Sequence, residues 1–287
     1  MSATASILLG IAAMLGFGVA DYLAKTLLTK ANVFRTALIS QGIGSLLFVV
    51  AAFAYDRMFP SVALFSLALF SGLISGAVLC GYYAALSLGK ASLVAPVFSC
   101  LTVVAVALSF LVLGETLTDL QLSAITIVFL GVVLVALERN TGGAERPRKL
   151  SLLLALSAAV IGGANLILQK WIAESGHYLM GFLITRISSA TFMTPLALAP
   201  GRETRLVEVS QSWLKLALLG LLDVSAFFAW YLGLRVGLVS IVTPIATSSP
   251  AVTVVLAHLF LKERVRLHQR IGIVAIISGI VLLSAIS

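Results

Sequence analysis

The second half of this chain repeats the first half at an offset of 148 residues. Residues of the same type recur without a gap, in the pairs Gly72 and Gly220, Tyr83 and Tyr231, Gly89 and Gly237, Ser92 and Ser240, Pro96 and Pro244, Glu115 and Glu263, and Gly131 and Gly279. The loop GETLTDLQ around Glu115 contains two acids and no base, whereas its counterpart KERVRLHQR around Glu263 contains four bases and one acid. We therefore predict that matching loops lie on opposite sides of a membrane, with one half inverted relative to the other.

The composition indicates that most of the chain is surrounded by lipid. Hydrophobic residues make up 60% of the chain and charged residues only 10%, and the mean hydropathy is +1.12. Soluble domains contain about 25% charged residues. The net charge of +8 comes from bases in short loops between apolar runs, where they orient the chain in the membrane. We therefore expect no nucleic-acid partner.

Apolar runs long enough to cross a bilayer follow one another along the whole chain. A transmembrane helix needs roughly 20 mostly apolar residues. We predict ten, near residues 5–27, 36–55, 62–87, 91–113, 119–138, 150–172, 178–199, 213–234, 239–261 and 268–286. The predicted fold is an all-α integral membrane protein with two inverted five-helix repeats, residues 1–138 and 150–287, joined by a linker at residues 139–149. Because five is odd, the second repeat must enter the membrane in the reverse direction.

Lysine and arginine are distributed unevenly between the two sides of the predicted bundle. Fifteen of the 19 lie in or beside the odd-numbered connections between spans. The other four are Arg57, Lys170, Arg186 and Arg235. Because cytoplasmic loops carry the excess of bases, we expect a multi-pass protein of the inner (cell) membrane with both termini on the outer side.

Each half also contains a glycine, a proline seven residues later and a glutamate nineteen residues beyond that: Gly89, Pro96 and Glu115, then Gly237, Pro244 and Glu263. This pattern, with the stretches GFGVADYLAK and GGANLILQK, resembles the EamA-type drug/metabolite transporter superfamily. The resemblance implies a ten-helix basket around a central cavity lined mainly by the first, third and fourth helices of each half. Members carry amino acids, amines, nucleotide sugars, sugar phosphates and other metabolites, so it indicates no single substrate. Members are often described with both termini inside, unlike the prediction from the charges.

Ionisable side chains within membrane spans are costly and mark candidate functional sites. Four stand out: Asp21, Arg186, Asp223 and His258. Asp21 would either line the cavity or pair with Lys25 one helical turn later. Asp223 is a candidate for coupling to protons if it is unpaired, whereas a pair with Arg186 would hold it charged. Arg186 and His258 are further candidates for coupling, with packing roles as the alternative.

Aromatic residues stand at matching places in the two halves. Tyr82 and Tyr83 in the third span correspond to Trp230 and Tyr231 in the eighth. These four would wall a cavity and offer stacking or cation–π contacts, or else form aromatic belts at the two membrane interfaces. Tyr22, next to Asp21, is counted with them as a candidate substrate contact.

The stretch TPIATSSP in the ninth span is the strongest candidate for direct binding. Each of its two prolines frees a backbone carbonyl, which nearby hydroxyls can satisfy or which a substrate can use. The candidate hydroxyl residues are Thr243, Thr247 and Ser248, with Ser249 next to them in the same stretch. The first half reads APVFSCLT here, with one proline and fewer hydroxyls, which favours an asymmetric site. Asn165 and Gln169, one turn apart in the sixth span, are expected to face the same cavity.

Together these features predict a secondary active transporter that moves a small polar or amphipathic metabolite by alternating access, with an amino acid exporter preferred. Organic cations or drugs, sugar phosphates and nucleotide sugars are the alternative cargo. The chain has no GxxxxGK[ST] motif, so substrate exchange or an ion gradient, with protons as the candidate ion, would supply the energy. An intramembrane enzyme is disfavoured because neither a GxSxG nor an HExxH motif is present. A channel is disfavoured because channels usually build their selectivity ring from identical subunits, whereas an internal duplication favours two mobile halves.

No cofactor or metal site is predicted. Cys80 and Cys100 lie inside apolar spans and are interpreted as packing residues, and no cluster of Cys and His has the spacing of metal ligands. The expected partners are a small-molecule substrate and the lipid bilayer, and the expected assembly is a monomer or a weak homodimer.

Overall fold

The protein folds into a bundle of long helices. The computed structural model describes residues 3–28, 33–55, 60–88, 91–137, 149–198, 213–262 and 265–286. Its helices are α1 (Ala3–Leu28), α2 (Val33–Tyr55), α3 (Val62–Leu88), α4 (Ala91–Leu113), α5 (Asp119–Ala136), α6 (Lys149–Glu174), α7 (Tyr178–Ala197), α9 (Trp213–Val236), α10 (Val239–Ala246), α11 (Ser249–Leu261) and α12 (Leu267–Ile286). Every regular element among the described residues is a helix, so the predicted all-α architecture is confirmed. Residues 139–148 of the predicted linker lie outside the described residues.

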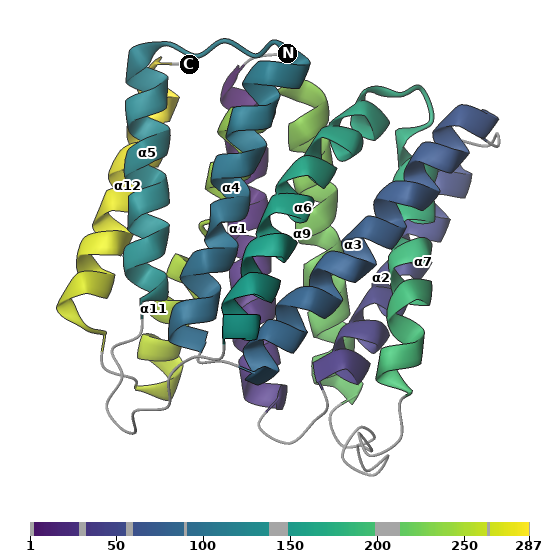
Figure 1. Ribbon diagram of the computed structural model, residues 1–287, viewed down its shortest axis with the longest axis horizontal. Helices are drawn as coiled ribbons and strands as arrows, with labels where there is room; N and C mark the ends of the chain where they lie inside the picture. The colour runs from purple at the N-terminus through teal and green to yellow at the C-terminus, as the bar shows by residue number, and fades with distance from the viewer. Residues whose placement is uncertain are drawn as a thin grey trace.

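Equivalent helices of the two halves run in opposite directions (Figure 1). Helix α1 begins at the upper end of the bundle in Figure 1, where both chain termini lie, and α12 returns to it. Helix α6, the first of the second half, begins at the lower end. We call these the termini end and the linker end. The reversal is the arrangement that an inverted repeat requires.

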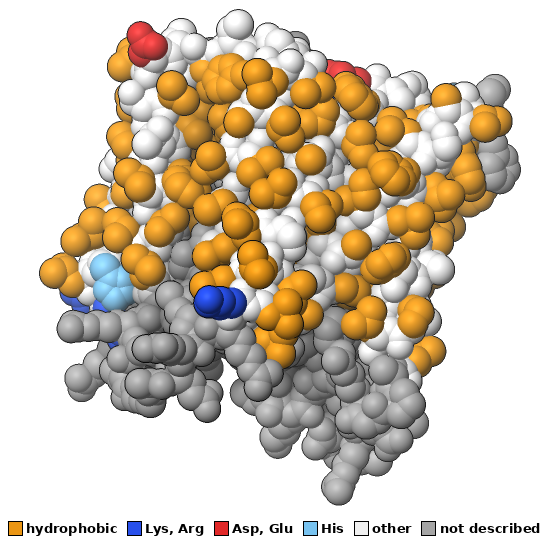
Figure 2. Space-filling model, viewed as in Figure 1, with side chains coloured by type: hydrophobic (Ala, Val, Ile, Leu, Met, Phe, Trp, Pro, Cys, Tyr) orange, Lys and Arg blue, Asp and Glu red, His pale blue; other side chains and the backbone are white. Residues whose placement is uncertain are grey.

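The outer surface of the bundle matches a lipid environment. Seven stretches of the described chain are long and apolar enough to cross a membrane, and Gln41–Tyr55 and Val97–Leu113 form shorter apolar helices. Large apolar side chains point outward, with Leu111 81% exposed. Figure 2 shows hydrophobic side chains over the height of the visible face and few charged ones among them. In a bilayer such a surface is solvated by lipid tails, while all backbone groups bond within the helices.

The predicted ninth helix is divided in two. Helix α10 ends at Ala246 and α11 begins at Ser249, because Pro250 has no N–H to donate to the preceding turn. The hydroxyls there bond carbonyls of the preceding turn: Thr247 donates to the Thr243 oxygen at 2.8 Å, and Ser248 donates to the Pro244 oxygen at 2.7 Å. The single helix expected over residues 239–261 is thus corrected to two helices that meet in mid-bundle.

The two halves are interleaved, since neighbouring helices within one half pack little against each other. Helix α1 packs mainly against α9, α10 and α11, whereas its counterpart α6 packs mainly against α3 and α4. Helix α2 packs against α9 and helix α3 against α7, while the pairs α2 with α7 and α5 with α12 join equivalent helices. Two mixed bundles result, which we call bundle A (α1, α2, α9, α10 and α11) and bundle B (α3, α4, α6 and α7).

Glycine contacts repeat across the pseudo-twofold arrangement. A Cβ at Gly18 would lie 2.4 Å from the Val252 Cβ, and a Cβ at Gly163 would lie 2.7 Å from the Val104 Cβ. Gly163 follows Gly18 by 145 residues, and Val252 follows Val104 by 148. The same close approach of helices therefore occurs once in each bundle, at places where only glycine leaves room.

Candidate functional site

A cavity of about 650 Å³ lies between bundles A and B. Its lining includes Val135 and Ala136 from the last turn of α5 and Leu219 from the beginning of α9, so it extends to the linker end. On the other side of mid-bundle, the residues of α10 from Val239 to Ile245 are buried and do not line it. This volume is in the range that encloses a small organic molecule.

The cavity contains a buried ion pair. The Arg186 guanidinium on α7 donates to the Asp223 carboxylate on α9 over 2.7 Å, and the two side chains are 5% and 22% exposed. The guanidinium also lies 4.4 Å from the centre of the Phe227 ring, a cation–π distance. Asp223 and Arg186 are therefore each other's partner, and the charge of Arg186 is neutralised within the protein.

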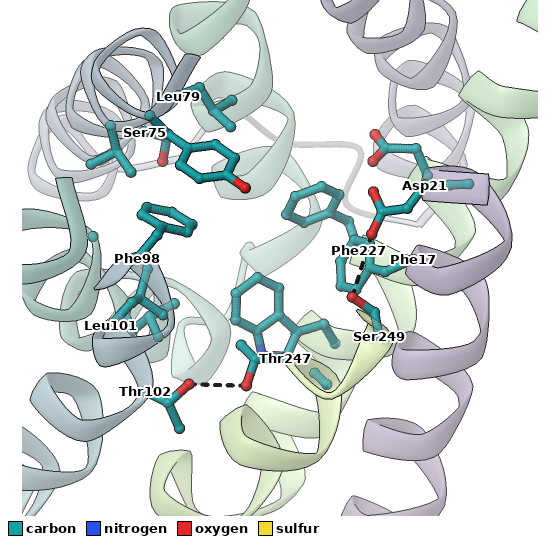
Figure 3. A pocket seen from close by; sticks show the side chains of 18 of the residues that line it. Phe17, Asp21, Ser75, Leu79, Phe98, Leu101, Thr102, Phe227, Thr247 and Ser249 are labelled. Atoms are coloured by element: carbon teal, nitrogen blue, oxygen red, sulfur yellow. Dashed lines mark hydrogen bonds between the residues drawn. The ribbon is translucent and has the colours of Figure 1, made fainter. Parts of the chain in front are cut away.

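A second carboxylate, that of Asp21, is exposed to the cavity near the linker end of α1. The Ser249 hydroxyl donates to one of its oxygens over 3.5 Å, as Figure 3 shows. Asp223 lies close enough for the charges of the two carboxylates to interact. Within the described residues Asp21 forms no ion pair, and the Lys25 side chain lies outside them.

Amide side chains of α6 form the opposite wall. The Asn165 amide nitrogen donates to the Ser71 carbonyl over 3.2 Å and to the Ser75 hydroxyl over 2.9 Å, and Gln169 reaches Ser75 at 3.5 Å. The carbonyl oxygens of both amides are buried without a hydrogen-bond partner among the described residues. Ser75 and Asp21 face each other across the cavity in Figure 3, so acceptor groups stand on both sides of it.

Aromatic rings wall the space between these polar groups. Phe17 meets Phe227 edge to face at 4.8 Å and Trp230 at 5.8 Å. Tyr82 stacks on Phe98 with ring centres 4.2 Å apart. These rings give the cavity a largely apolar interior with polar groups at its edges, the composition typical of a small-molecule site.

Tyr231 lies deeper, next to Trp230. Its ring is 2% exposed and stacks on Phe182 with centres 3.5 Å apart. Trp230 has a buried indole N–H with no described partner. The second-half pair thus lines the side of the cavity nearer the termini end, whereas the Tyr83 side chain of the first-half pair lies outside the described residues.

The stretch TPIATSSP contributes fewer side chains to the cavity than its composition suggests. Thr247 faces the cavity and shares a 3.0 Å hydrogen bond with Thr102 of α4, the one direct link drawn across the cavity between α4 and the α10–α11 break in Figure 3. Thr243 and Ser248 are fully buried and do not line the cavity. The Ser248 hydroxyl bonds the Pro244 carbonyl, the Thr243 hydroxyl has no described partner, and Ser249 lines the cavity beside Asp21.

Two other predicted residues also lie away from the cavity. Tyr22 contacts Phe260 of α11 at a ring distance of 6.0 Å. His258 is exposed on α11 and is not a lining residue. By contrast, Asp21, Tyr82, Asn165, Gln169, Arg186, Asp223, Trp230, Tyr231 and Thr247 all line it.

Several lining residues escaped the sequence analysis. Phe17 stands one turn before Asp21, and Phe227 stands one turn after Asp223, so helical spacing from each acid could have found both rings. Gln41 donates to the Met193 sulfur over 3.1 Å and keeps a buried carbonyl oxygen without a described partner. Gln41 is an amide inside the span predicted at 36–55, a signal of the same kind as Asn165 and Gln169, and could have been found by it.

The termini end is closed by polar contacts between the two bundles. Glu115, in the loop after α4, is 7% exposed and accepts hydrogen bonds from the backbone N–H of Val239 at 2.7 Å and of Ser240 at 3.0 Å, and from the Ser240 hydroxyl. A carboxylate is favourable there, because the first N–H groups of α10 have no partner within the helix.

Lys170 of α6 makes the second contact at this end. Its ammonium group donates to the carbonyl oxygens of Leu234 at 2.5 Å and Gly237 at 2.8 Å, and lies 3.1 Å from the exposed Glu174 carboxylate. It thus satisfies the last carbonyls of α9, which have no partner within the helix. We call the Glu115 and Lys170 contacts the two latches.

No group of three His, Cys, Asp or Glu side chains that could hold a metal occurs among the described residues. The free cysteines Cys80 and Cys100 lie in α3 and α4. The lining of the cavity offers a bound molecule charge, hydrogen bonds and aromatic contact.

Each half of the chain matches one family. The model of the EamA-like transporter family fits residues 4–137 and again residues 149–285. An uncharacterised protein of Methanocaldococcus jannaschii is 33% identical over 135 residues, which are 47% of this chain and 96% of that protein, so that relative has about the length of one repeat. A crystal structure has the same fold over 99% of this chain and 98% of its own, with a TM-score of 0.79 and 18% identity.

Proposed function

Because this multi-pass chain belongs to the EamA-like transporter family, we propose that it is a secondary active transporter for a small amphipathic metabolite, working by alternating access. The observation that carries the proposal is the asymmetry of the cavity between bundles A and B. It extends to the linker end, while Glu115 and Lys170 hold the termini end closed. A site open to one side only is what a carrier needs in each of its two states.

The interleaving of the halves supports a particular motion. Since α1 is packed on α9 and α6 on α3 and α4, the two sequence halves are not separable bodies. We infer that bundles A and B rock against each other. The pairs α2 with α7 and α5 with α12 join equivalent helices along the pseudo-twofold axis, so they are placed to serve as the pivots.

We infer the direction of transport from the distribution of charged residues. Fifteen of the 19 bases lie in or beside connections at the linker end, which the excess of bases assigns to the cytoplasm. The cavity then loads from the cytoplasm, with both termini outside, and this arrangement favours export. Because Arg186 is already the partner of Asp223 at 2.7 Å, we infer that Asp21, which forms no ion pair among the described residues, is the carboxyl group for coupling to protons.

The test is transport by the purified protein in lipid vesicles. A thermal-stability screen with amino acids, amines, sugar phosphates and nucleotide sugars first identifies a ligand, because binding to the folded state raises the unfolding midpoint. We expect saturable uptake of that ligand in labelled form, and a transient accumulation when vesicles are preloaded with the unlabelled compound. Uptake that rises linearly with concentration and ignores the preloaded compound would indicate a channel instead.

Removing the Glu115 latch is expected to open the termini end. Glu115→Gln keeps the size of the side chain but leaves a backbone N–H facing an amide NH₂ group. If the closed state at the termini end loses about 2 kcal/mol of stability, the ratio of the open to the closed state rises roughly 30-fold. Spin labels on cysteines replacing Leu8 of α1 and Leu111 of α4, both exposed at this end, should report longer distances in Glu115→Gln.

The matched control for this experiment is Asp119→Asn. Asp119 stands in the first turn of α5, four residues after Glu115, and is exposed. Its replacement removes an acid from the same region without breaking a contact between bundles. Equal distance distributions in Glu115→Gln and the parent protein would rule out Glu115 as a latch.

A further inference from the structure

We propose that the cavity selects organic cations, with Asp21 as the anionic partner of a protonated amine on an apolar or aromatic molecule. This inference rests on the proposed function, because it names the substrate class of the same cavity. It separates amines from amino acids, which carry a carboxylate as well, and from phosphorylated sugars.

The first argument is the charge of the cavity. Among the described residues, the ionisable acids and bases that line it are Asp21, Asp223 and Arg186, with a formal sum of −1. Arg186 and Asp223 neutralise each other at 2.7 Å, which leaves the charge on Asp21. In a cavity walled by hydrocarbon this charge is weakly screened, so it attracts a cation and repels an anion.

The second argument is the position of the rings. Phe17 stands one helical turn before Asp21, and its ring packs against those of Phe227 and Trp230. Figure 3 shows Phe17 and Phe227 beside the Asp21 carboxylate. A carboxylate next to aromatic rings offers an ammonium group both a counter-ion and cation–π contacts, while the body of the molecule lies on the rings.

The third argument is the polarity of the buried groups that lack a partner. The amide nitrogens of Gln41 and Asn165 donate to the Met193 sulfur and to the Ser71 carbonyl, which accept but cannot donate. Their carbonyl oxygens and that of Gln169 are acceptors without a described partner, beside two donors in the same state, the Trp230 indole N–H and the Arg186 Nε–H. Three acceptors against two donors among these lining residues favour a ligand with a second N–H or O–H group over one with a carboxylate.

The experiment uses four probes with one phenyl ring and different charge: 2-phenylethylammonium, phenylalanine, 3-phenylpropionate and 2-phenylethanol. Binding to the purified full-length protein in detergent is measured by calorimetry and by the shift of the unfolding midpoint. We expect 2-phenylethylammonium to bind tightest, at least about tenfold tighter than 3-phenylpropionate. That ratio corresponds to about 1.4 kcal/mol.

Asp21→Asn should remove this preference. The affinity for 2-phenylethylammonium is expected to fall at least about tenfold, while that for 2-phenylethanol stays the same, which shows that the cavity is intact. Asp21→Glu should retain the preference for the cation. Asp119→Asn, on the exposed surface, should change neither affinity.

Three results would overturn the inference. These are tighter binding of phenylalanine or 3-phenylpropionate than of the cation, no binding of the cation at millimolar concentration, and an equal loss of cation and alcohol binding in Asp21→Asn. None of these results contradicts the proposed function. That function is contradicted only if reconstituted vesicles show no carrier-type exchange of any ligand from the wider screen.

Discussion

Asp223→Ala is expected to lower the free energy of unfolding by roughly 3–5 kcal/mol, because it leaves the Arg186 guanidinium buried without its partner. Arg186 is 5% exposed on its side chain, and its second charge contact is the face of the Phe227 ring at 4.4 Å. That ring cannot replace a carboxylate at 2.7 Å. The measurement is the midpoint of thermal or denaturant unfolding in a mild detergent.

The double variant tests whether the loss comes from the unpaired charge. Replacing both members of a buried ion pair by apolar residues of similar size is often neutral or stabilising. We therefore expect Arg186→Met with Asp223→Leu to unfold close to the parent protein, although it loses two polar groups of the cavity. If the double variant is as unstable as Asp223→Ala, the pair is needed for packing, and charge neutralisation is not its main role.

Gly72→Ala is expected to separate α3 from α7 and to cost about 3 kcal/mol of stability. A Cβ at this position would lie 2.4 Å from the Thr185 carbonyl oxygen and 2.5 Å from the Ser188 Cβ. Since the first of these atoms belongs to the backbone of a packed helix, it cannot move aside as the end of a flexible side chain can. The measurements are the unfolding midpoint and the fraction of monodisperse protein after extraction.

Gly42→Ala is the control for this prediction. Gly42 lies within α2, and no atom lies within 4 Å of the place where its Cβ would stand. Both variants replace a helical glycine by alanine, so the effects on the unfolded chain and on helix propensity are alike. We expect Gly42→Ala to leave the midpoint unchanged or slightly raised. Equal unfolding midpoints of the two variants would show that the packing of α3 against α7 does not depend on their close approach at Gly72.

The sequence predicted the elements well because their signals are local. Apolar runs of membrane length ended by glycine, proline and charged residues place the helices within a few residues of their observed bounds. The exception is the ninth span, where Pro244 and Pro250 were recognised but the division into α10 and α11 was not. Whether a proline bends a helix or breaks it depends on the groups around it in the folded protein, and these are not visible in the local sequence.

The candidate site could be predicted in part for a similar reason. An acid or an amide inside an apolar span is visible in the sequence, and Asp21, Asn165, Gln169 and Asp223 all line the cavity. The partners of these groups could be named only as alternatives, as Arg186 was for Asp223. Arg186 and Asp223 lie 37 residues apart on different helices, and no spacing rule relates residues on helices whose mutual packing is unknown.

The duplication could be predicted from the sequence alone, and its inversion followed from the five spans predicted in each half, because both depend on a one-dimensional pattern and on the cost of polar groups in lipid. The interleaving of the halves appears only in the folded protein, where Glu115 meets Val239 and Ser240 across 124 and 125 residues. In the sequence Glu115 was visible as one member of a repeated pair with Glu263, but the residues that it contacts could not be predicted. Packing between helices depends on the fit of whole surfaces, such as those at Gly18 and Gly163, and that fit exists only once the helices are in contact.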